Sequence, residues 1–278
     1  MGKMTPEEVK RIEFEILCSF DDICKEHGLV YCLAYGTCLG AVRHGGFIPW
    51  DDDIDVYMPR DDYETLYRLH FDNSIDWKYN IVSSRDGSSY HPTYKVTDPN
   101  TVCHEAFIDK RYSIGLWIDV FPLDTIDLSS NETKRTLDTI VSTNTKLRRK
   151  LSFAVGDPLE GSTPAARLIK RIATPFSRNL DPIKISQEIE SNSRSLPDAL
   201  SSNGMQDLSV VDISESVGKM IYSFPYNMIF PTTFATFEGR TFPVPGKTED
   251  YLTRCYGDWQ TLPPEDERHS HFAEAYAL

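Results

Sequence analysis

The stretch Gly45–Val56, which reads GGFIPWDDDIDV, places four carboxylates within five residues, directly after a turn-like run of glycine and aromatic residues. So much negative charge in one place costs folding energy unless a cation neutralises it. On a strand, Asp51, Asp53 and Asp55 would project to one side and the remaining aspartate to the other. Converging oxygen ligands suit a hard divalent cation that keeps room for phosphate oxygens. The stretch therefore predicts metal-assisted chemistry on a phosphorylated substrate, against the alternative of a solvated acidic loop.

Two neighbouring segments place this run in an ordered site. Upstream, Tyr31–Tyr35 is typical of a short buried strand that ends at Gly36-Thr37, and a helical pattern follows over Cys38–Arg43. Backbone N–H groups at such a helix start can meet a phosphate. Further along, Asp119 lies in the apolar run Ile114–Phe121, where an uncompensated carboxylate would be costly to bury.

Gly36-Thr37, Asp53-Ile54-Asp55 and Asp119 together resemble the pattern of the nucleotidyltransferase superfamily. The narrower match is to the LicD family of phosphotransferases, whose distant relatives include fukutin and the fukutin-related protein. Thr37 stands where serine or glycine is usual, and the gap to Asp53 is long for the superfamily, but the LicD pattern accommodates both. The resemblance runs from about Leu29 to Arg268, with the middle third unmatched, and is carried by these stretches: Tyr35–Val56, Tyr94–Val96, Trp117–Asp124, Tyr256–Trp259 and Leu262–Glu265.

The resemblance implies transfer of phosphocholine from CDP-choline to a hydroxyl of a teichoic-acid or lipopolysaccharide-type glycan, with CMP as the leaving group. Asp53 and Asp55 would hold Mg²⁺, with Mn²⁺ as the alternative ion, and Asp51 would be a further ligand or would orient Asp53. Asp119 would complete the metal site or accept a proton, unless a structural arginine satisfies it.

The substrate-binding residues implied by the resemblance are Gly36, Thr37, Arg43 and Lys95. Arg43 closes a predicted helix, so an interaction with the helix terminus competes with a phosphate contact. Lys95 is either an ordinary surface lysine or, on a strand beside the aspartates, a phosphate ligand. Tyr256 and Asp258 resemble family positions whose roles the residue types alone do not indicate.

Three other functions fit parts of the pattern. The donor could be CDP-ribitol or CDP-glycerol, which an aromatic cage for a trimethylammonium group would argue against. An Asp-x-Asp motif also occurs in Mn²⁺-dependent glycosyltransferases that use sugar nucleotides, although those usually open with a parallel nucleotide-binding sheet. A binding protein without turnover is the third alternative, and the full set of carboxylates argues against it.

The net charge of −13 excludes nucleic acid as the expected partner, because a phosphate backbone attracts lysine and arginine. One stretch departs from this charge: residues 141–180 carry eight basic and two acidic residues, interleaved with apolar ones. Such a stretch is typical of docking on an anionic membrane, of holding a phosphate-rich acceptor, or of an ordinary surface helix. The sequence has no long apolar run and no signal-like start, which predicts a cytoplasmic protein with a peripheral contact at the inner membrane face as one option.

The expected fold is α/β (α+β), a nucleotidyltransferase-like mixed sheet flanked by helices, with a helical insertion. We expect a catalytic core over residues 1–128, a mainly helical insertion over 129–223, and a C-terminal hairpin and motif segment over 224–278 that packs back on the core. Thr5-Pro6-Glu7-Glu8 supplies a capping box for a helix that Gly28 ends, and Thr236–Phe242 predicts a hairpin with a Glu-Gly turn. The six cysteines lack metal-site spacing and are expected to be reduced.

Overall fold

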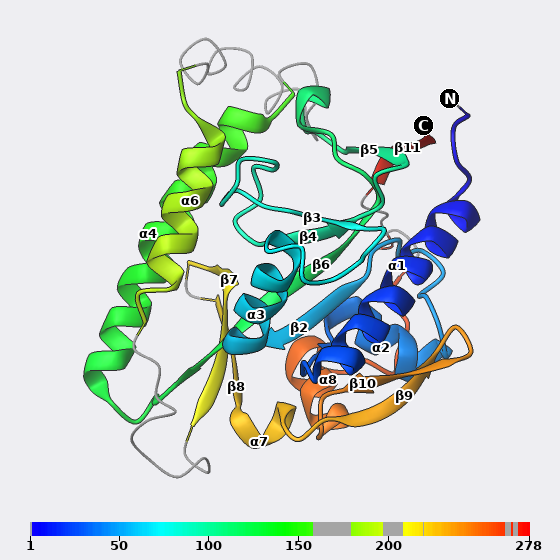
Figure 1. The fold of residues 1–278 in the computed structure, drawn as a ribbon. Helices are drawn as coiled ribbons and strands as arrows, with labels where there is room; N and C mark the ends of the chain where they lie inside the picture. The colour runs from blue at the N-terminus through cyan, green and yellow to red at the C-terminus, as the bar shows by residue number, and fades with distance from the viewer. Residues whose placement is uncertain (1, 158–178, 197–207, 219, 265–267, 269–271) are drawn as a thin grey trace.

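A computed structural model describes residues 2–157, 179–196, 208–218, 220–264, 268 and 272–278 of the chain (Figure 1). The described part is a mixed α/β structure with seven α-helices and a seven-stranded sheet that contains one parallel strand pair. This arrangement confirms the predicted fold class.

The elements follow one another along the chain with these bounds. The helices are α1 (Pro6–His27), α2 (Tyr35–His44), α3 (Arg60–Phe71), α4 (Asn131–Val155), α6 (Pro182–Ser193), α7 (Tyr226–Ile229) and α8 (Thr248–Tyr256). The strands are β1 (Cys32–Leu33), β2 (Asp55–Pro59), β3 (Asn80–Val82), β4 (Lys95–Thr97), β5 (Thr101–Glu105), β6 (Trp117–Ile126), β7 (Ser209–Val217), β8 (Met220–Pro225), β9 (Thr233–Phe237), β10 (Arg240–Val244) and β11 (Phe272–Ala277).

Local signals set the ends of α1 as predicted. The Thr5 side chain accepts a hydrogen bond from the backbone N–H of Glu8, and the Glu8 side chain accepts one from the N–H of Thr5. Gly28 ends the helix with φ of 66°, a left-handed conformation that glycine adopts without steric cost. The predicted hairpin is also confirmed, since β9 and β10 pair antiparallel around Glu238 and Gly239, both at positive φ.

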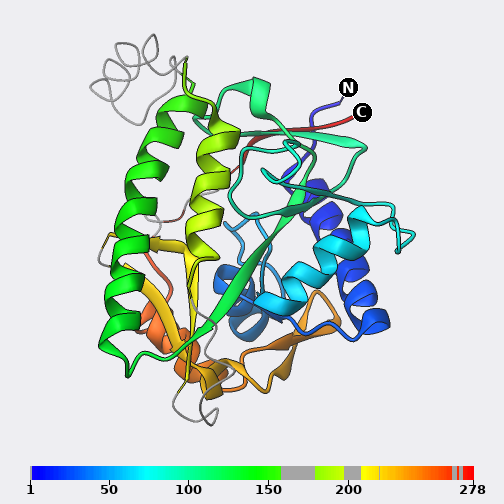
Figure 2. The same ribbon diagram turned by 60° about the vertical axis from the view of Figure 1, so that its left-hand side comes forward.

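Strand β6 organises the sheet. Its first half lies between β2, which runs parallel to it, and β4, which runs antiparallel, in the strand order β1-β2-β6-β4-β3. Its second half continues past these neighbours and pairs with β7, which in turn pairs with β8. Helices α1 and α3 contact β6, and α2 contacts β2. Figure 2 shows β6 running across the molecule from the core towards the α4–α6 side.

The start of α2 differs from the prediction. The strand β1 is only two residues long, and the helix begins at Tyr35 rather than at Cys38, so that Gly36 and Thr37 lie in its first turn. Tyr35 turns the chain abruptly, with φ of 40°, and its backbone N–H donates to the Tyr251 hydroxyl at 2.9 Å. The apolar run read as a strand therefore ends early because Tyr35 adopts a left-handed backbone conformation.

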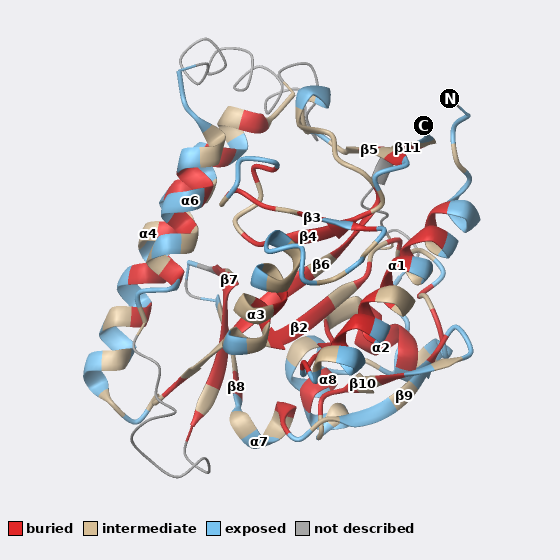
Figure 3. Cartoon of the chain, in the orientation of Figure 1, coloured by how far each residue is buried: buried red, intermediate tan, exposed pale blue. Residues whose placement is uncertain are grey.

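Helices α4 and α6 pack against each other at one side of the molecule (Figures 1 and 2). Their apolar faces form two clusters separate from the main core, one around Leu147, Leu151 and Ile189 and one around Val141 and Ile213. Figure 3 shows that burial is concentrated in the sheet and on the inner faces of these helices. The strand pair β7–β8 was not predicted within the mainly helical insertion, and the division at residues 128 and 223 stays a prediction.

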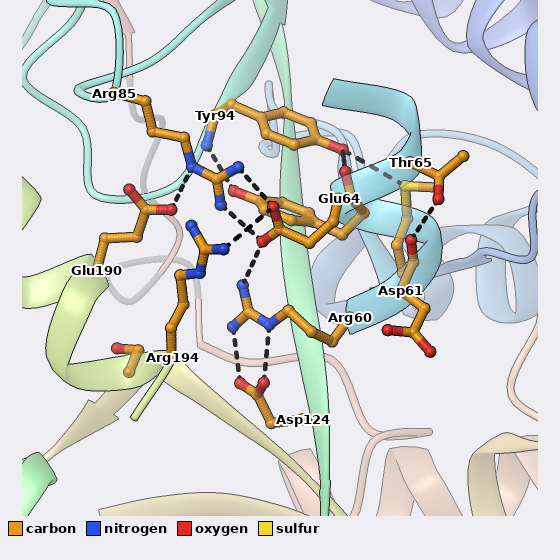
Figure 4. Close-up of polar contacts among 12 residues, drawn as sticks. Arg60, Asp61, Glu64, Thr65, Arg85, Tyr94, Asp124, Glu190 and Arg194 are labelled. Atoms are coloured by element: carbon orange, nitrogen blue, oxygen red, sulfur yellow. Dashed lines mark hydrogen bonds and ion pairs between the residues drawn. The ribbon is translucent and has the colours of Figure 1, made fainter. Parts of the chain in front are cut away.

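An ionic seam of Arg60, Glu64, Arg85, Asp124 and Glu190 joins α6 to the core (Figure 4). Arg60 donates two hydrogen bonds of 2.7 Å to Asp124 at the end of β6, and Arg85 donates two of 2.7 Å to Glu64 on α3. Arg85 also donates to Glu190 on α6. Bidentate arginine–carboxylate pairs fix geometry as well as charge, so this seam holds α6 in one position relative to the sheet.

The predicted basic stretch is only partly visible. Residues 158–178, which carry four of its cations including Lys170 and Arg171, lie outside the described residues. Arg148 is described, and it is not a surface cation: one of its terminal nitrogens donates to the Ser214 carbonyl, and its Nε is buried. Among the described residues, no helix is long and apolar enough to cross a bilayer. The membrane contact stays a prediction.

Candidate active site

Three neighbouring strands place charged side chains opposite one another. Asp55 at the start of β2 is in register with Asp119 on the parallel strand β6, and Lys95 at the start of β4 is in register with Asp119 from the other side. Residues directly opposite on adjacent strands lie within side-chain contact distance. The sheet therefore brings together two of the predicted catalytic carboxylates and the predicted lysine.

Asp119 is fully compensated by its neighbours. Lys95 Nζ donates to Asp119 Oδ1 at 2.5 Å, and Trp117 Nε1 donates to Oδ2 at 2.8 Å. Lys95 Nζ also lies 4.4 Å from the centre of the Trp117 ring. Burial by itself would lower the pKa of Lys95, but the charges of Asp119 and then Glu105 outweigh burial and raise it. The cation that satisfies Asp119 is therefore a lysine, where the sequence suggested an arginine as the structural alternative.

The odd-numbered aspartates face one cavity, as the alternation predicted. Asp51, Asp53 and Asp55 all line a cavity of about 730 Å³, whereas Asp52 is buried and does not line it. Only Asp55 is within β2; the two others precede the strand. The opposite wall of the cavity comes from the C-terminal segment around Tyr256 and Trp259.

A second cavity of about 370 Å³ meets the first at Tyr35, Asp53 and Asp55, which line both. Its other charged groups are Lys95, Asp119, Arg148 and Glu215. Burial, the charge of Asp212 and that of Asp119 raise the pKa of Glu215 to about 7 against the opposing effect of Arg148. Asp53 and Asp55 thus lie at the junction of two cavities of different size.

Gly36 and Thr37 contribute to the position of the aspartates. The Thr37 hydroxyl accepts a hydrogen bond from the backbone N–H of Asp55 at 2.8 Å, which fixes the start of β2. A Cβ atom on Gly36 would lie 2.4 Å from Asp51 Oδ2, so only glycine lets this carboxylate approach the first turn of α2. These contacts give both residues a positioning role, and their predicted contact with substrate stays a prediction.

Arg43 joins the two ends of the larger cavity. It lies in the last turn of α2, and its Nη1 donates to the Trp259 carbonyl at 2.6 Å. This contact ties the first motif to the C-terminal stretch around Trp259, so both lie at the same cavity. Glu265 and the histidines at 269 and 271 lie outside the described residues.

Asp53 and Asp55 present oxygen donors of the kind that a magnesium ion carrying substrate would require. Burial raises the pKa of Asp55 well above its ordinary value, and the charges of Asp53, Asp119 and Asp51 raise it further, so a bound cation would relieve this repulsion. Within the described ranges, no three acidic, histidine or cysteine side chains form a ready ligand group. Mg²⁺ usually takes one or two carboxylates, with water and phosphate oxygens filling the other positions, and Asp53 with Asp55 supplies that minimum.

Glu13 is a buried carboxylic acid near the aspartates that the sequence did not reveal. It lies on the buried face of α1, and neither of its carboxylate oxygens has a hydrogen-bond partner. Burial, followed by the charges of Asp53, Asp52 and Asp119, raises the pKa of Glu13 well above its ordinary value, opposed by Lys10. The one sequence signal for the burial of Glu13 was its helical spacing, which placed it beside the apolar positions of α1.

We expect the Glu13→Gln variant to gain stability over the wild type as the pH rises from about 5 to about 8. Above the unfolded-state pKa, the unfolded chain releases a proton that the folded chain retains, so the wild type loses up to about 1.4 kcal/mol per pH unit until the folded-state pKa is reached. Urea unfolding at several pH values measures the difference. Glu15→Gln, on the exposed face of the same helix, is the matched control, and a pH-independent gain in Glu13→Gln would contradict the assignment.

One part of the chain is similar to a known family. Residues 28–129 match the family model described as LicD/FKTN/FKRP, nucleotidyltransferase domain. The chain therefore contains a LicD-type nucleotidyltransferase domain over these residues, in the region where its sequence motifs resemble that family. The matched residues contain Asp55, Lys95 and Asp119, which the sheet brings together, and Asp53, which precedes β2 and lines both cavities.

One similar protein matches the chain over its full length. The chain is 29% identical over 287 residues to the lipopolysaccharide cholinephosphotransferase LicD of Haemophilus influenzae, and the match covers 100% of both chains. A shorter match, 35% identical over 56 residues, is to the uncharacterized protein RP689 of Rickettsia prowazekii and covers 20% of this chain and 21% of that protein.

Proposed function

We propose that the protein transfers phosphocholine from CDP-choline to a hydroxyl group of a cell-surface glycan, of lipopolysaccharide or teichoic-acid type. The observation that carries the proposal is the match over the whole chain to a lipopolysaccharide cholinephosphotransferase. The geometry supports it, because paired aspartates at the junction of two chambers suit a diphosphate with a different group on each side.

The two cavities would take the two halves of the donor. The larger cavity, with Trp259, Tyr256 and Arg43 on its walls, would take the cytidine and its phosphate. The smaller cavity would take the choline end and would admit the acceptor hydroxyl. Asp53 and Asp55 would hold Mg²⁺ between them, and the ion would neutralise charge on the diphosphate oxygens during the reaction.

In the proposed reaction the acceptor oxygen forms a bond to the choline-bearing phosphorus. The bond from that phosphorus to the bridging oxygen breaks, and CMP departs with the electron pair. Asp119, which lines the smaller cavity, would receive the hydroxyl proton or share the metal, and Lys95 would hold its carboxylate in place. Most of the rate in such chemistry comes from positioning and electrostatics rather than from covalent participation of the protein.

A donor screen tests this proposal. Purified protein with Mg²⁺ and a choline-free lipopolysaccharide oligosaccharide is incubated in turn with CDP-choline, CDP-ribitol, CDP-glycerol and a UDP-sugar. We expect CMP release and a mass gain of one phosphocholine on the oligosaccharide with CDP-choline alone. Transfer from CDP-ribitol or CDP-glycerol in its place would support the related donor, UDP release would support a glycosyltransferase, and donor binding without transfer to any acceptor would support a binding protein.

A further inference from the structure

Three aromatic side chains line one part of the smaller cavity, and transfer of the phosphoryl group does not by itself require them. Tyr35, Phe121 and Tyr222 all line this cavity. The Tyr35 ring lies 5.5 Å from that of Tyr222 at 87° and 5.7 Å from that of Phe121 at 90°. Several rings around one space can turn negative faces towards it, and cations such as quaternary ammonium groups bind over such faces.

We propose that Tyr35, Phe121 and Tyr222, with the carboxylate of Glu215, form the recognition site for the trimethylammonium group of the donor. The inference rests on the proposed function and specifies where choline selectivity arises. A trimethylammonium group cannot donate a hydrogen bond, so it is recognised by aromatic surface and by nearby negative charge.

The charge of the cavity agrees with a cationic ligand. Its lining contains four carboxylates, Asp53, Asp55, Asp119 and Glu215, and two cations, Lys95 and Arg148. Lys95 is engaged by Asp119, and Arg148 donates to the Ser214 carbonyl. Burial and the neighbouring Asp212 raise the pKa of Glu215, which shows that the cations present do not fully stabilise its charge. A ligand cation beside Glu215 would supply the positive charge that stabilises its carboxylate.

Tyr35 is held firmly enough to act as a wall. Its hydroxyl donates to Asp212 Oδ2 at 2.8 Å, and its backbone N–H donates to the Tyr251 hydroxyl. It keeps a left-handed backbone conformation that a bulky residue rarely adopts, and such strain is found at ligand-binding positions. A fixed ring loses little conformational entropy when the ligand binds.

The larger cavity is the competing location, because Trp50 and Trp259 line it. The ring of Trp50 is already covered by the guanidinium of Arg268, 4.4 Å from its centre. Tyr256 and Trp259 remain there, and a flat pyrimidine base can stack on them. The larger cavity therefore suits the base and the smaller cavity suits the trimethylammonium group. Variants of Tyr222 and Trp259 test this assignment.

The test compares CDP-choline with CDP-3,3-dimethylbutanol, in which a carbon atom replaces the ammonium nitrogen and the shape is kept. Calorimetry with Mg²⁺ gives the ratio of the two Kd values for the wild type, Tyr222→Phe, Tyr222→Leu and Trp259→Leu. We expect the wild type and Tyr222→Phe to bind CDP-choline at least about thirtyfold more tightly, because desolvated cation–π contacts have that magnitude. In Tyr222→Leu the ratio should fall about tenfold, whereas Trp259→Leu should weaken both donors and keep the ratio.

The outcomes distinguish failure of the proposed trimethylammonium site from failure of the proposed function. An unchanged ratio in Tyr222→Leu, or a collapsed ratio in Trp259→Leu, would overturn the assignment while the wild-type preference for CDP-choline stands. A wild type that binds the two donors equally and transfers from CDP-glycerol instead would overturn the proposed function itself. Tyr222→Phe, which keeps the aromatic face and loses only the hydroxyl, controls for folding of the leucine variant.

Discussion

Asp53→Asn and Asp55→Asn are each expected to lower phosphocholine transfer by at least about a hundredfold. Loss of a metal ligand removes several kcal/mol of stabilisation of the charge that develops on the diphosphate, and each 1.36 kcal/mol is a factor of about ten in rate. Both aspartates line the two cavities at their junction, where the metal and the diphosphate would meet. CMP release at saturating Mg²⁺ and CDP-choline measures the effect.

The same variants should fold as well as the wild type, and Asp55→Asn should unfold at a higher temperature in metal-free buffer. Burial and four neighbouring carboxylates already raise the pKa of Asp55, so removal of its charge relieves repulsion. Asp52→Asn is the matched control, because Asp52 belongs to the same acidic run and does not line either of these cavities. Near-normal turnover in Asp53→Asn or Asp55→Asn would remove that residue from the metal site.

The second large effect is expected at the buried pair of Lys95 and Asp119. Lys95→Met should destabilise the protein by about 3–5 kcal/mol, because it leaves a buried carboxylate without its cation. Asp119→Asn should cost less, since Asp55 and Glu105 also attract Lys95. Adding Asp119→Asn to Lys95→Met should then restore part of the lost stability. Urea unfolding of the four proteins completes the cycle, and additive losses would show that the pair is not coupled.

Donor binding to Asp119→Asn separates its two proposed roles in the reaction. If Asp119 is a metal ligand, the variant should lose Mg²⁺-dependent affinity for CDP-choline. If Asp119 accepts the proton, affinity should be retained while turnover falls by roughly 10²–10⁴-fold. Calorimetry with and without Mg²⁺ gives the answer, and a variant with wild-type turnover would exclude Asp119 from both roles.

Local signals predicted much of the fold and of the site. A capping box and a glycine defined α1, a Glu-Gly turn defined the β9–β10 hairpin, and the acidic run with its alternation placed Asp53 and Asp55 in one cavity. These features depend on residues close together in the sequence, where propensity and side-chain periodicity apply. The family resemblance added Asp119 and Lys95.

The remainder depends on contacts distant in sequence. The pairing of β7 with the second half of β6 joins residues more than eighty positions apart, and the alternating polar residues Asp212, Ser214 and Ser216 gave it little apolar character. The sequence therefore did not predict that Glu215, on β7, would line the smaller cavity. Tyr35 was read as the end of a strand, because nothing in a single sequence reveals a bulky residue held at positive φ by a hydrogen bond from its backbone to Tyr251.

The ionic seam between α6 and the sheet has a consequence for how this protein can diversify. Interlocked apolar cores restrict substitution on both sides, since each side chain must fit its neighbours. Here α4 and α6 pack in two smaller apolar clusters, one of which also contains Ile126 of β6 and Val211 of β7, and Arg60, Arg85 and their carboxylate partners add a polar connection. As long as those charges and apolar contacts persist, other positions on the helical side can change and reshape the cavity wall that carries Arg148, while the aspartate-bearing sheet stays intact.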